Sequence, residues 1–330
     1  MHILVSLLLV LTNLFPTHVR TTSLEADFGF SVGSNQPWNS HRRQDFAALQ
    51  QAHASIIRVD IPWMYLQPDY RGQAFNWSLF DPVISDAKDY GLDTLAILHT
   101  VPHWANNSGG DYAPATDLSL QVNYCYKVAQ RYLARGITKY EIGNEVNLNH
   151  PGWNPDGKFY TINLLNPCVK GLRKASIEAH KSITVLGASS APTQPDNGID
   201  PEVFLNQVKS ASGLSQFDVV SWHPYTIYPL TDSAMSSTPD SLHSISNKPI
   251  WATEFGAPTS GEWSVSEQRQ AELVSEAKSA WFSHSYAGPL FWYSSRDLGQ
   301  YPSTEREDYF GVIRYDGSLK PAYYELQRSF

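Results

Sequence analysis

The sequence of 330 residues has few basic residues and no nucleotide-binding glycine motif, and each of these shortages excludes a class of function. Lys and Arg number 24 against 32 Asp and Glu, a net charge of −8. No basic run is visible, which argues against a nucleic-acid partner and against anchoring on acidic lipid. Neither G-x-G-x-x-G nor G-x-x-x-x-G-K-[ST] occurs, so the usual dinucleotide and P-loop sites are excluded and no cofactor is predicted.

The first residues have the pattern of a signal peptide, which we place at residues 1–23. Residues 3–15 are mostly apolar and Pro16 ends the run, which is too short to cross a bilayer. We expect cleavage between Val19 and Ala26, with an uncleaved signal anchor as the alternative. This leader predicts a secreted protein with no membrane attachment once it is removed.

Aromatic residues are abundant, with 10 Trp, 18 Tyr and 14 Phe. Flat rings stack well on the C–H faces of sugars, although filling a protein core is an equally good use for any one of them. Four tryptophans could either stack on a sugar or pack within a loop, and the sequence favours neither role: Trp38, Trp104, Trp153 and Trp263.

From Ala26 onward, short apolar runs alternate with amphipathic stretches. Strands are predicted near 27–32, 55–60, 93–98, 138–143, 183–188, 217–222, 249–254 and 288–293. Helices are predicted near 41–53, 79–90, 119–135, 160–180, 201–211, 240–246, 265–284 and 320–328. Eight such units predict a parallel sheet closed into a barrel. We therefore expect residues 24–330 to form a single α/β domain, a (β/α)8 TIM barrel without an appended β-sandwich, in a monomeric protein.

The two cysteines, Cys125 and Cys168, fall in predicted helices that would be neighbours on the outside of this barrel. A disulfide is therefore predicted, with two buried free thiols as the alternative. Neither has a Cys or His partner at the spacing of metal ligands, so no metal site is predicted. Two sequons, at Asn76 and Asn106, are candidate glycosylation sites.

Two glutamates end apolar runs, Glu145 on the fourth predicted strand and Glu254 on the seventh. In a barrel of this kind the chemistry lies at the C-terminal ends of the strands. Other polar and aromatic residues in or after the predicted strands are Trp38, Arg58, His99, Trp104, Asn144, His223, Tyr225 and Trp292. Either glutamate alone could be a solvated carboxylate at the end of a strand, but two such glutamates together indicate a catalytic site.

Two facing carboxyl groups can break a glycosidic bond. One protonates the leaving oxygen, and the other attacks carbon directly when the two lie about 5–5.5 Å apart, with retention of configuration. Glu145 must then hold its proton near neutral pH while Glu254 stays ionised. Arg58 is placed to keep Glu254 charged, and Tyr225 to donate a hydrogen bond to it.

At this point five segments resemble a known group of enzymes. The motifs at 143–145, 223–225 and 251–256 resemble glycoside hydrolase clan A, the 4/7 barrel superfamily. Those at 58–63 and 75–81 resemble the family 39 and family 39-like endoglycosidases, with family 5 next. The resemblance covers essentially the whole chain after the leader.

The resemblance implies a role for each site residue. Glu145 would be the acid/base and Glu254 the nucleophile, with Asn144 on the sugar 2-hydroxyl. Arg58, His223 and Tyr225 would support the two carboxylates, and Trp292 would form the floor of the −1 subsite. Substrate contacts are also assigned to Trp38, His99 and Trp104.

The function expected from these observations is a secreted retaining β-glycoside hydrolase that cleaves a β-linked polysaccharide or oligosaccharide internally. An exo-acting β-glycosidase and a cell-wall transglycosylase would use the same residues. A non-catalytic sugar-binding barrel is a further alternative, although it would be expected to lack one of the two carboxylates.

Overall fold

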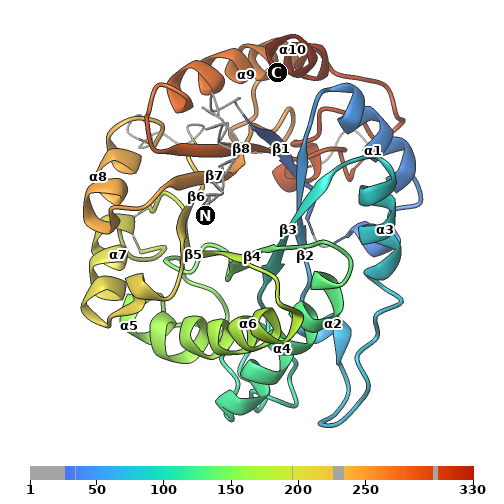
Figure 1. The fold of residues 1–330 in the computed structure, drawn as a ribbon. Coiled ribbons are helices and arrows are strands. Elements are labelled where there is room, and N and C mark those ends of the chain that lie inside the picture. Colours follow the sequence, from blue (N-terminus) through green and yellow to red (C-terminus); the bar gives the residue numbers. More distant parts are fainter. Residues whose placement is uncertain (1–26, 34, 195, 226–233, 300–303) are drawn as a thin grey trace, which may run out of the picture.

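The computed structural model describes residues 27–330 except 34, 195, 226–233 and 300–303, so the predicted signal peptide lies outside the described residues. Its parallel strands form a closed barrel in chain order (Figure 1). They are β1 (Phe28–Ser31), β2 (Ile56–Asp60), β3 (Asp93–Leu98), β4 (Lys139–Ile142), β5 (Thr184–Ser190), β6 (Val219–Trp222), β7 (Ile250–Phe255) and β8 (Ala287–Tyr293). Strand β8 pairs with β1, which closes the ring.

Helices surround the barrel (Figure 1). They are α1 (Arg42–Gln51), α2 (Trp63–Leu66), α3 (Asp81–Asp89), α4 (Leu118–Leu133), α5 (Gly157–Tyr160), α6 (Asn166–Ala179), α7 (Pro201–Ser210), α8 (Ser237–Ser246), α9 (Glu267–Trp281) and α10 (Pro321–Ser329). The predicted TIM barrel is confirmed, and its predicted strands and longer helices are present; the one-turn helix α2 was not predicted. Among the described residues, no helix has both the length and the apolar character that crossing a bilayer requires.

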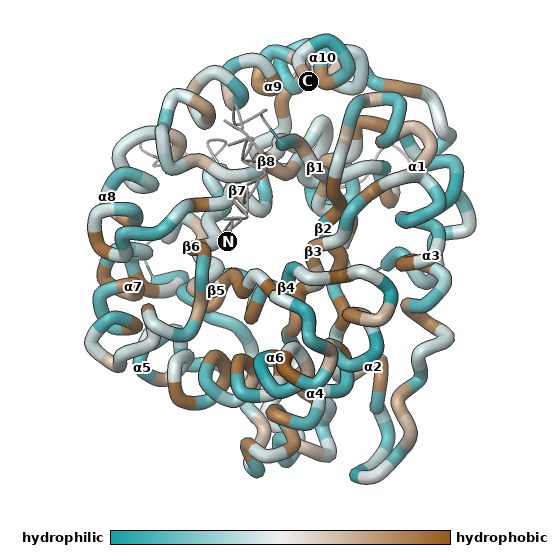
Figure 2. Tube along the Cα trace, in the orientation of Figure 1, coloured by the Kyte–Doolittle hydropathy of each residue, from teal (hydrophilic) through white to brown (hydrophobic). Residues whose placement is uncertain are grey.

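The strands are mostly apolar on both faces because each is covered on both sides. Inside the barrel a small apolar layer is formed by Ile56, Leu95, Leu186, Val219 and Phe291. The outward side chains belong to the larger core beneath the helices. Figure 2 shows the result as hydrophobic stretches along the central strands and more hydrophilic colour on the surrounding helices.

Helices α4 and α6 are joined by the predicted disulfide. Cys125 and Cys168 are bonded with their Cα atoms 5.2 Å apart, and both are fully buried. Gly171 on α6 permits this close approach, because a Cβ there would lie 2.3 Å from the carbonyl oxygen of Val122 on α4. The bridge therefore fastens the helix that precedes β4 to the helices that follow it.

The two sequons have different settings. Asn76 is exposed, so its glycosylation stays a prediction. Asn106 is 5% exposed, and its amide nitrogen donates hydrogen bonds to backbone carbonyls, including that of Gly110 at 2.6 Å. In the folded chain this nitrogen is not available to a glycan, and the expectation for Asn106 is corrected accordingly.

We expect the Cys125→Ala/Cys168→Ala variant to lose about 4 kcal/mol of unfolding free energy, because the bridge closes a loop of 43 residues. Activity at 25 °C should persist, since the bridge lies in the outer ring of helices. Denaturant unfolding followed by tryptophan fluorescence measures the loss, with reduced wild type as the control. An unchanged midpoint would show that the bridge contributes nothing to stability.

Candidate active site

The alternation of side chains along the strands decides which residues reach the mouth of the barrel. On β2, Ile56 belongs to the inner apolar layer, so Arg58 and Asp60 face the same way and stand progressively nearer the C-terminal end. On β8, Phe291 faces inward, and Tyr293 therefore does so as well. The catalytic end of the barrel is thus an inward polar layer above an apolar one.

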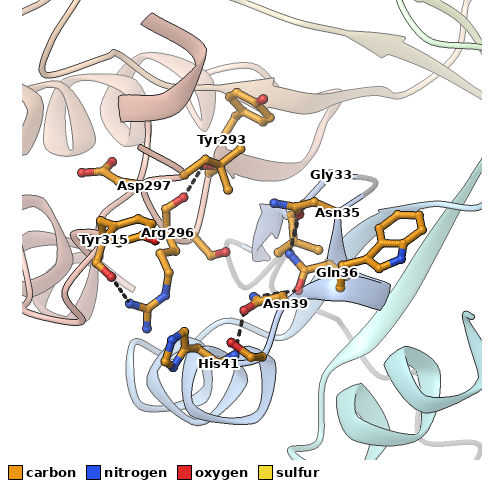
Figure 3. Close-up of a pocket in the computed structure, with 15 residues that line it drawn as sticks. Gly33, Asn35, Gln36, Asn39, His41, Tyr293, Arg296, Asp297 and Tyr315 are labelled. Atoms are coloured by element: carbon orange, nitrogen blue, oxygen red, sulfur yellow. Dashed lines mark hydrogen bonds between the residues drawn. The ribbon is translucent and has the colours of Figure 1, made fainter. Parts of the chain in front are cut away.

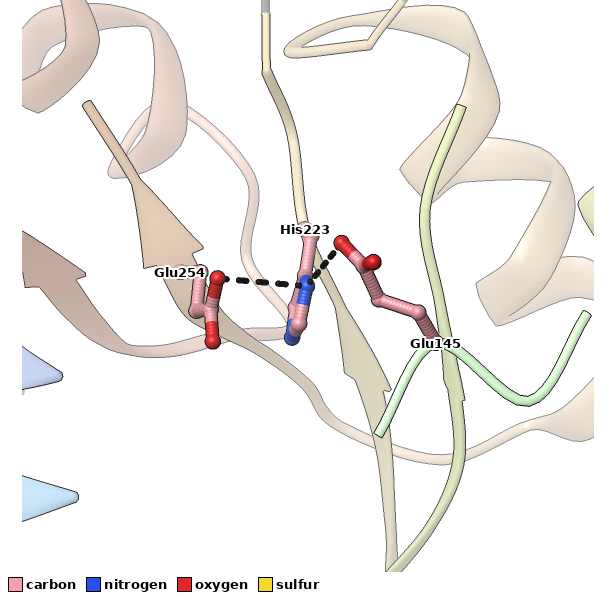
Figure 4. A group of neighbouring side chains, drawn as sticks. All are labelled: Glu145, His223 and Glu254. Carbon is pink, nitrogen blue, oxygen red and sulfur yellow. Dashed lines mark hydrogen bonds and ion pairs between the residues drawn. The ribbon is translucent and has the colours of Figure 1, made fainter. Parts of the chain in front are cut away.

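The two candidate carboxylates meet at this end. Glu254 lies in β7, and Glu145 follows β4 after a turn in which Gly143 has φ +84° and Glu145 itself φ +47°. A Cβ at Gly143 would lie 2.4 Å from Cγ1 of Val146, so this turn requires glycine. One carboxylate oxygen of each glutamate and Nδ1 of His223 all lie within 4.8 Å of one another (Figure 4). The short separation expected from the sequence is confirmed.

Arg58 is the residue beneath this pair. It is 1% exposed and donates a hydrogen bond to Oε1 of Glu254, as predicted. It also donates to Oε2 of Glu141 at 2.6 Å and to Oδ1 of Asn144 at 2.8 Å. Although burial lowers the pKa of Arg58, the charges of Glu141 and Glu254 raise it further, so the guanidinium stays charged.

Glu141 was not singled out by the sequence, because it stands inside an apolar run. It is fully buried, and Ser221 donates a hydrogen bond to it at 2.5 Å. Burial raises the pKa of this carboxyl, but Arg58 lowers it to below its usual value. The signal that could have found it is its position: an acidic residue facing inward on β4, at the level of Arg58 on β2.

Two residues after β6 support the candidate glutamates. The hydroxyl of Tyr225 donates to Oε2 of Glu254 at 2.9 Å, as predicted. Nδ1 of His223 lies 3.0 Å from Oε1 of Glu145 and 3.7 Å from Oε2 of Glu254. The imidazole is fully buried and joins the two carboxylates.

The structure corrects the expectation that Glu145 has a raised pKa. Burial does raise it, but the hydrogen bond and charge of His223 and the charges of His150 and Arg58 together hold the pKa below its usual value. The opposite direction was expected because Glu145 must deliver a proton, and the resemblance placed His223 near the two carboxylates without showing that its ring contacts Glu145. In the free enzyme Glu145 is therefore held ionised near neutral pH.

Trp292 does not form the floor of the site. Its ring is 2% exposed on the outer face of β8, where its Nε1 lies 3.4 Å from the carbonyl oxygen of Phe310. The next residue, Tyr293, faces inward and lines the cavity around Glu145 and Glu254. Tyr293 therefore occupies the position that was expected for Trp292, because neighbouring side chains on a strand point to opposite faces.

The other predicted contacts divide between cleft and core. Trp104 packs against Trp63 and donates to the carbonyl of Gln67 at 2.8 Å, so its ring contributes to packing, and its contact with substrate stays a prediction. Trp153 similarly donates to the carbonyl of Val146. Trp38 is 59% exposed and lines a cavity, whereas His99 is buried at the end of β3.

In the part of the chain that the structure describes, three cavities with shared lining residues follow one another across the barrel mouth. The central one, of about 310 Å³, is lined by Glu145 and Glu254. A second, of about 290 Å³, shares Glu145 and is walled by Trp263, whose ring packs under the guanidinium of Arg306 at 4.6 Å. The third, of about 390 Å³, is lined by segments after β1 and β8 (Figure 3) and shares Gly33 and Tyr293 with the central one. Together they form a cleft with the two carboxylates between its ends.

Glu145, His223 and Glu254 are also spaced so that they could hold a metal ion. Both oxygens of Glu254 already accept hydrogen bonds, from Arg58 and Tyr225, and His223 Nδ1 is engaged with Glu145. This donor set fits an acid–base pair, and the absence of a metal cofactor stays a prediction.

Comparison with known families decides the class of enzyme. The model of the family described as cellulase (glycosyl hydrolase family 5) matches residues 20–293. The chain belongs to glycosyl hydrolase family 5. It is therefore an O-glycosyl hydrolase of clan A, the group that the motifs resembled, in the family placed second to family 39. No curated protein sequence matches the chain.

Solved structures with the same fold come from several families. A family 39 enzyme from the gut symbiont Bacteroides cellulosilyticus superposes with a TM-score of 0.70 at 19% identity, over 92% of this chain and 63% of that one. Fungal β-1,4-galactanases give 0.69 at 17% identity, over 91% and 99%. A subfamily 18 member of family 5 from Bifidobacterium longum, in complex with Manβ1-4GlcNAc, gives 0.68 at 15% identity, over 92% and 77%. At these identities the likeness is one of fold.

The contact between His223 and Glu145 predicts a pH effect. Because His223 lowers the pKa of Glu145, the His223→Phe substitution should raise that pKa and move the basic limb of the kcat/KM profile to higher pH. Wild type should have its kcat/KM optimum on the acid side of neutrality. Profiles on an aryl glycoside test this, with His53→Phe, a histidine remote from the site, as the control. A basic limb that stays in place would contradict the assignment.

Proposed function

We propose that the protein is a retaining β-glycoside hydrolase that cleaves a β-linked polysaccharide internally, with Glu145 as acid/base and Glu254 as nucleophile. The observation that carries this proposal is the distance of 4.8 Å or less between a carboxylate oxygen of each residue. That spacing suits direct attack on the anomeric carbon, whereas inversion needs about 6.5–9.5 Å to admit a water.

The hydrogen bonds support this division of roles. Arg58 and Tyr225 donate to the two oxygens of Glu254 and hold the carboxylate ready to attack. Glu145 receives no such pair of donors from the described residues, and it lines the cavity that extends away from Glu254. A leaving group in that cavity would lie beside Glu145, where protonation is needed.

The reaction then has two steps. Glu254 attacks the anomeric carbon while Glu145 gives its proton to the leaving oxygen, and Glu145 afterwards activates the water that releases the glycosyl-enzyme. Asn144 accepts a hydrogen bond from Arg58 at its Oδ1, which leaves its amide nitrogen free to donate to the sugar 2-hydroxyl. Since His223 holds Glu145 ionised in the free enzyme, proton uptake at Glu145 accompanies productive substrate binding.

Internal cleavage is supported by the shape of the cleft. A cavity extends from the central one on each side, towards Trp263 and towards Trp38. A chain cut at its end would need room on one side only, so both cavities favour sugars bound on both sides of the scissile bond.

Secretion is part of the proposal. The apolar leader supports it, and so does the buried disulfide, because such bridges persist in oxidising compartments.

The two glutamates should respond differently to substitution. Glu254→Ala should abolish turnover of every substrate. Glu145→Ala should still form the glycosyl-enzyme from an activated aryl glycoside, accumulate it, and be rescued by azide to give the β-glycosyl azide. Mass spectrometry of the intermediate and NMR of the azide product are the measurements. Rescue confined to Glu254→Ala, or an α-azide from Glu145→Ala, would reverse the roles or the stereochemistry.

Trp38→Ala should affect long substrates selectively. Loss of an exposed ring at the far end of the cleft should lower kcat/KM about 5- to 150-fold on long oligosaccharides, the effect of about 1–3 kcal/mol of lost stacking and burial, and leave an aryl monoglycoside unaffected. Chromatographic sizing of products from a polysaccharide panel should show mid-length products. Single sugars released from chain ends would indicate exo action, and products longer than the substrate would indicate transglycosylation. Tyr70→Ala, another exposed aromatic outside the cavities, is the control.

A further inference from the structure

Asp60 is a third carboxylate at the catalytic cavity. It ends β2, two residues beyond Arg58 on the inward face, and it lines the same cavity as Glu145 and Glu254. Its side chain is 17% exposed, so it is largely enclosed yet open to the cavity. The catalytic roles proposed above make no use of it.

The carboxylate of Asp60 has no hydrogen bond to any described residue. Its ion-pair contact is with Nε2 of His99, at 3.8 Å, which is too long for a hydrogen bond. A largely enclosed carboxylate normally accepts hydrogen bonds, because burying it without them costs free energy. Asp60 therefore has acceptor capacity directed at the place where a sugar would lie.

His99, which follows β3, likewise makes no side-chain hydrogen bond to a described residue. It is 8% exposed, and neither of its ring nitrogens has a hydrogen-bond partner among the described residues. Burial lowers its pKa, and Arg58 adds to this effect, although Asp60 opposes it. The neutral ring offers one donor and one acceptor. Two adjacent strands thus end in neighbouring polar groups that the protein itself leaves unpaired.

The charge of the cavity restricts what these groups can bind. Among the described residues that line it, the acidic ones are Asp60, Glu145, Glu254 and Glu307, and the basic one is Arg306. Arg306 is paired with Glu307 at 3.0 Å, and Arg58 beneath the cavity is shared between Glu141 and Glu254. A sugar carrying a carboxylate would meet like charge, with no free cation among the described lining residues to offset it.

We propose that Asp60 is a specificity-determining residue: its carboxylate, with His99 beside it, accepts a hydrogen bond from a hydroxyl of the sugar in the catalytic cavity and selects uncharged sugars over uronic acids. This inference rests on the proposed glycosidase function. It adds recognition of one sugar hydroxyl group by Asp60 and the exclusion of uronic acids.

The test measures kcat/KM on aryl β-glycosides of the sugar that the polysaccharide panel identifies, together with its 2-, 3-, 4- and 6-deoxy analogues. For wild type, one deoxy analogue should react about 10- to 150-fold more slowly than the parent because of the lost bond to Asp60, the range of a hydrogen bond to a charged group. Asp60→Ala should slow the parent by a similar factor and leave that analogue nearly unchanged. Asp60→Asn, which keeps an acceptor oxygen, should recover part of the loss.

The second arm uses the aryl β-uronide of the same configuration. Wild type should prefer the neutral glycoside, and Asp60→Asn should raise the ratio of uronide to neutral rates by about tenfold, as removal of one nearby negative charge implies. Asp89→Asn is the matched control, since Asp89 is exposed on α3 and pairs with Arg43 far from the cleft. Unfolding midpoints of all variants check their folding.

Equal slowing of the parent and every deoxy analogue by Asp60→Ala would overturn the inference, because a structural role would act on all substrates alike. An unchanged uronide ratio in Asp60→Asn would overturn it as well. If wild type cleaves none of the parent glycosides, the proposed function fails; if wild type cleaves them and the deoxy profile is indifferent to residue 60, this inference alone fails.

Discussion

The site depends on one buried guanidinium. Arg58 stands inside the barrel between Glu141 and Glu254, and the three strands β2, β4 and β7 meet through its hydrogen bonds. A charge buried this completely is tolerable only when its partners satisfy it, and removing one partner from such a pair is strongly destabilising. Fold and catalysis therefore share one constraint, because the group that orients the candidate nucleophile is also the group that must be neutralised for the barrel interior to form.

Much of the fold could be predicted from the sequence, because alternating strand and helix patterns repeat with little irregularity. The two candidate glutamates could also be found, since each ends an apolar run and the barrel brings strand ends together. Arg58 and Tyr225 followed from the same argument. In each of these cases the spacing along one strand was enough, and no knowledge of how strands lie in register was required.

The remaining features depend on which face of a strand a side chain occupies and on which residues it contacts in the folded chain. Glu141 was missed because an acidic residue inside an apolar run has no distinctive pattern until its arginine partner is known. Trp292 was chosen over Tyr293 because the sequence does not show which of two successive aromatics faces inward. The expected direction of the Glu145 pKa was wrong because it was argued from the proton-donor role, and the sequence does not show that the ring of His223 contacts Glu145. Asn106 has a sequon, but its burial depends on how one loop folds back on itself.

The pairing of β1 with β8 has a consequence for folding kinetics. The contacts that complete the mouth join the first strand to the last: Ser31 on β1 pairs with Tyr293 on β8 and accepts a hydrogen bond from Arg58. Contacts between segments so distant in sequence form slowly, because a long loop must close first. A chain with seven strands assembled would still lack the Tyr293 wall of the catalytic cavity. Recovery of enzyme activity after dilution from denaturant would thus report ring closure rather than the formation of helices alone.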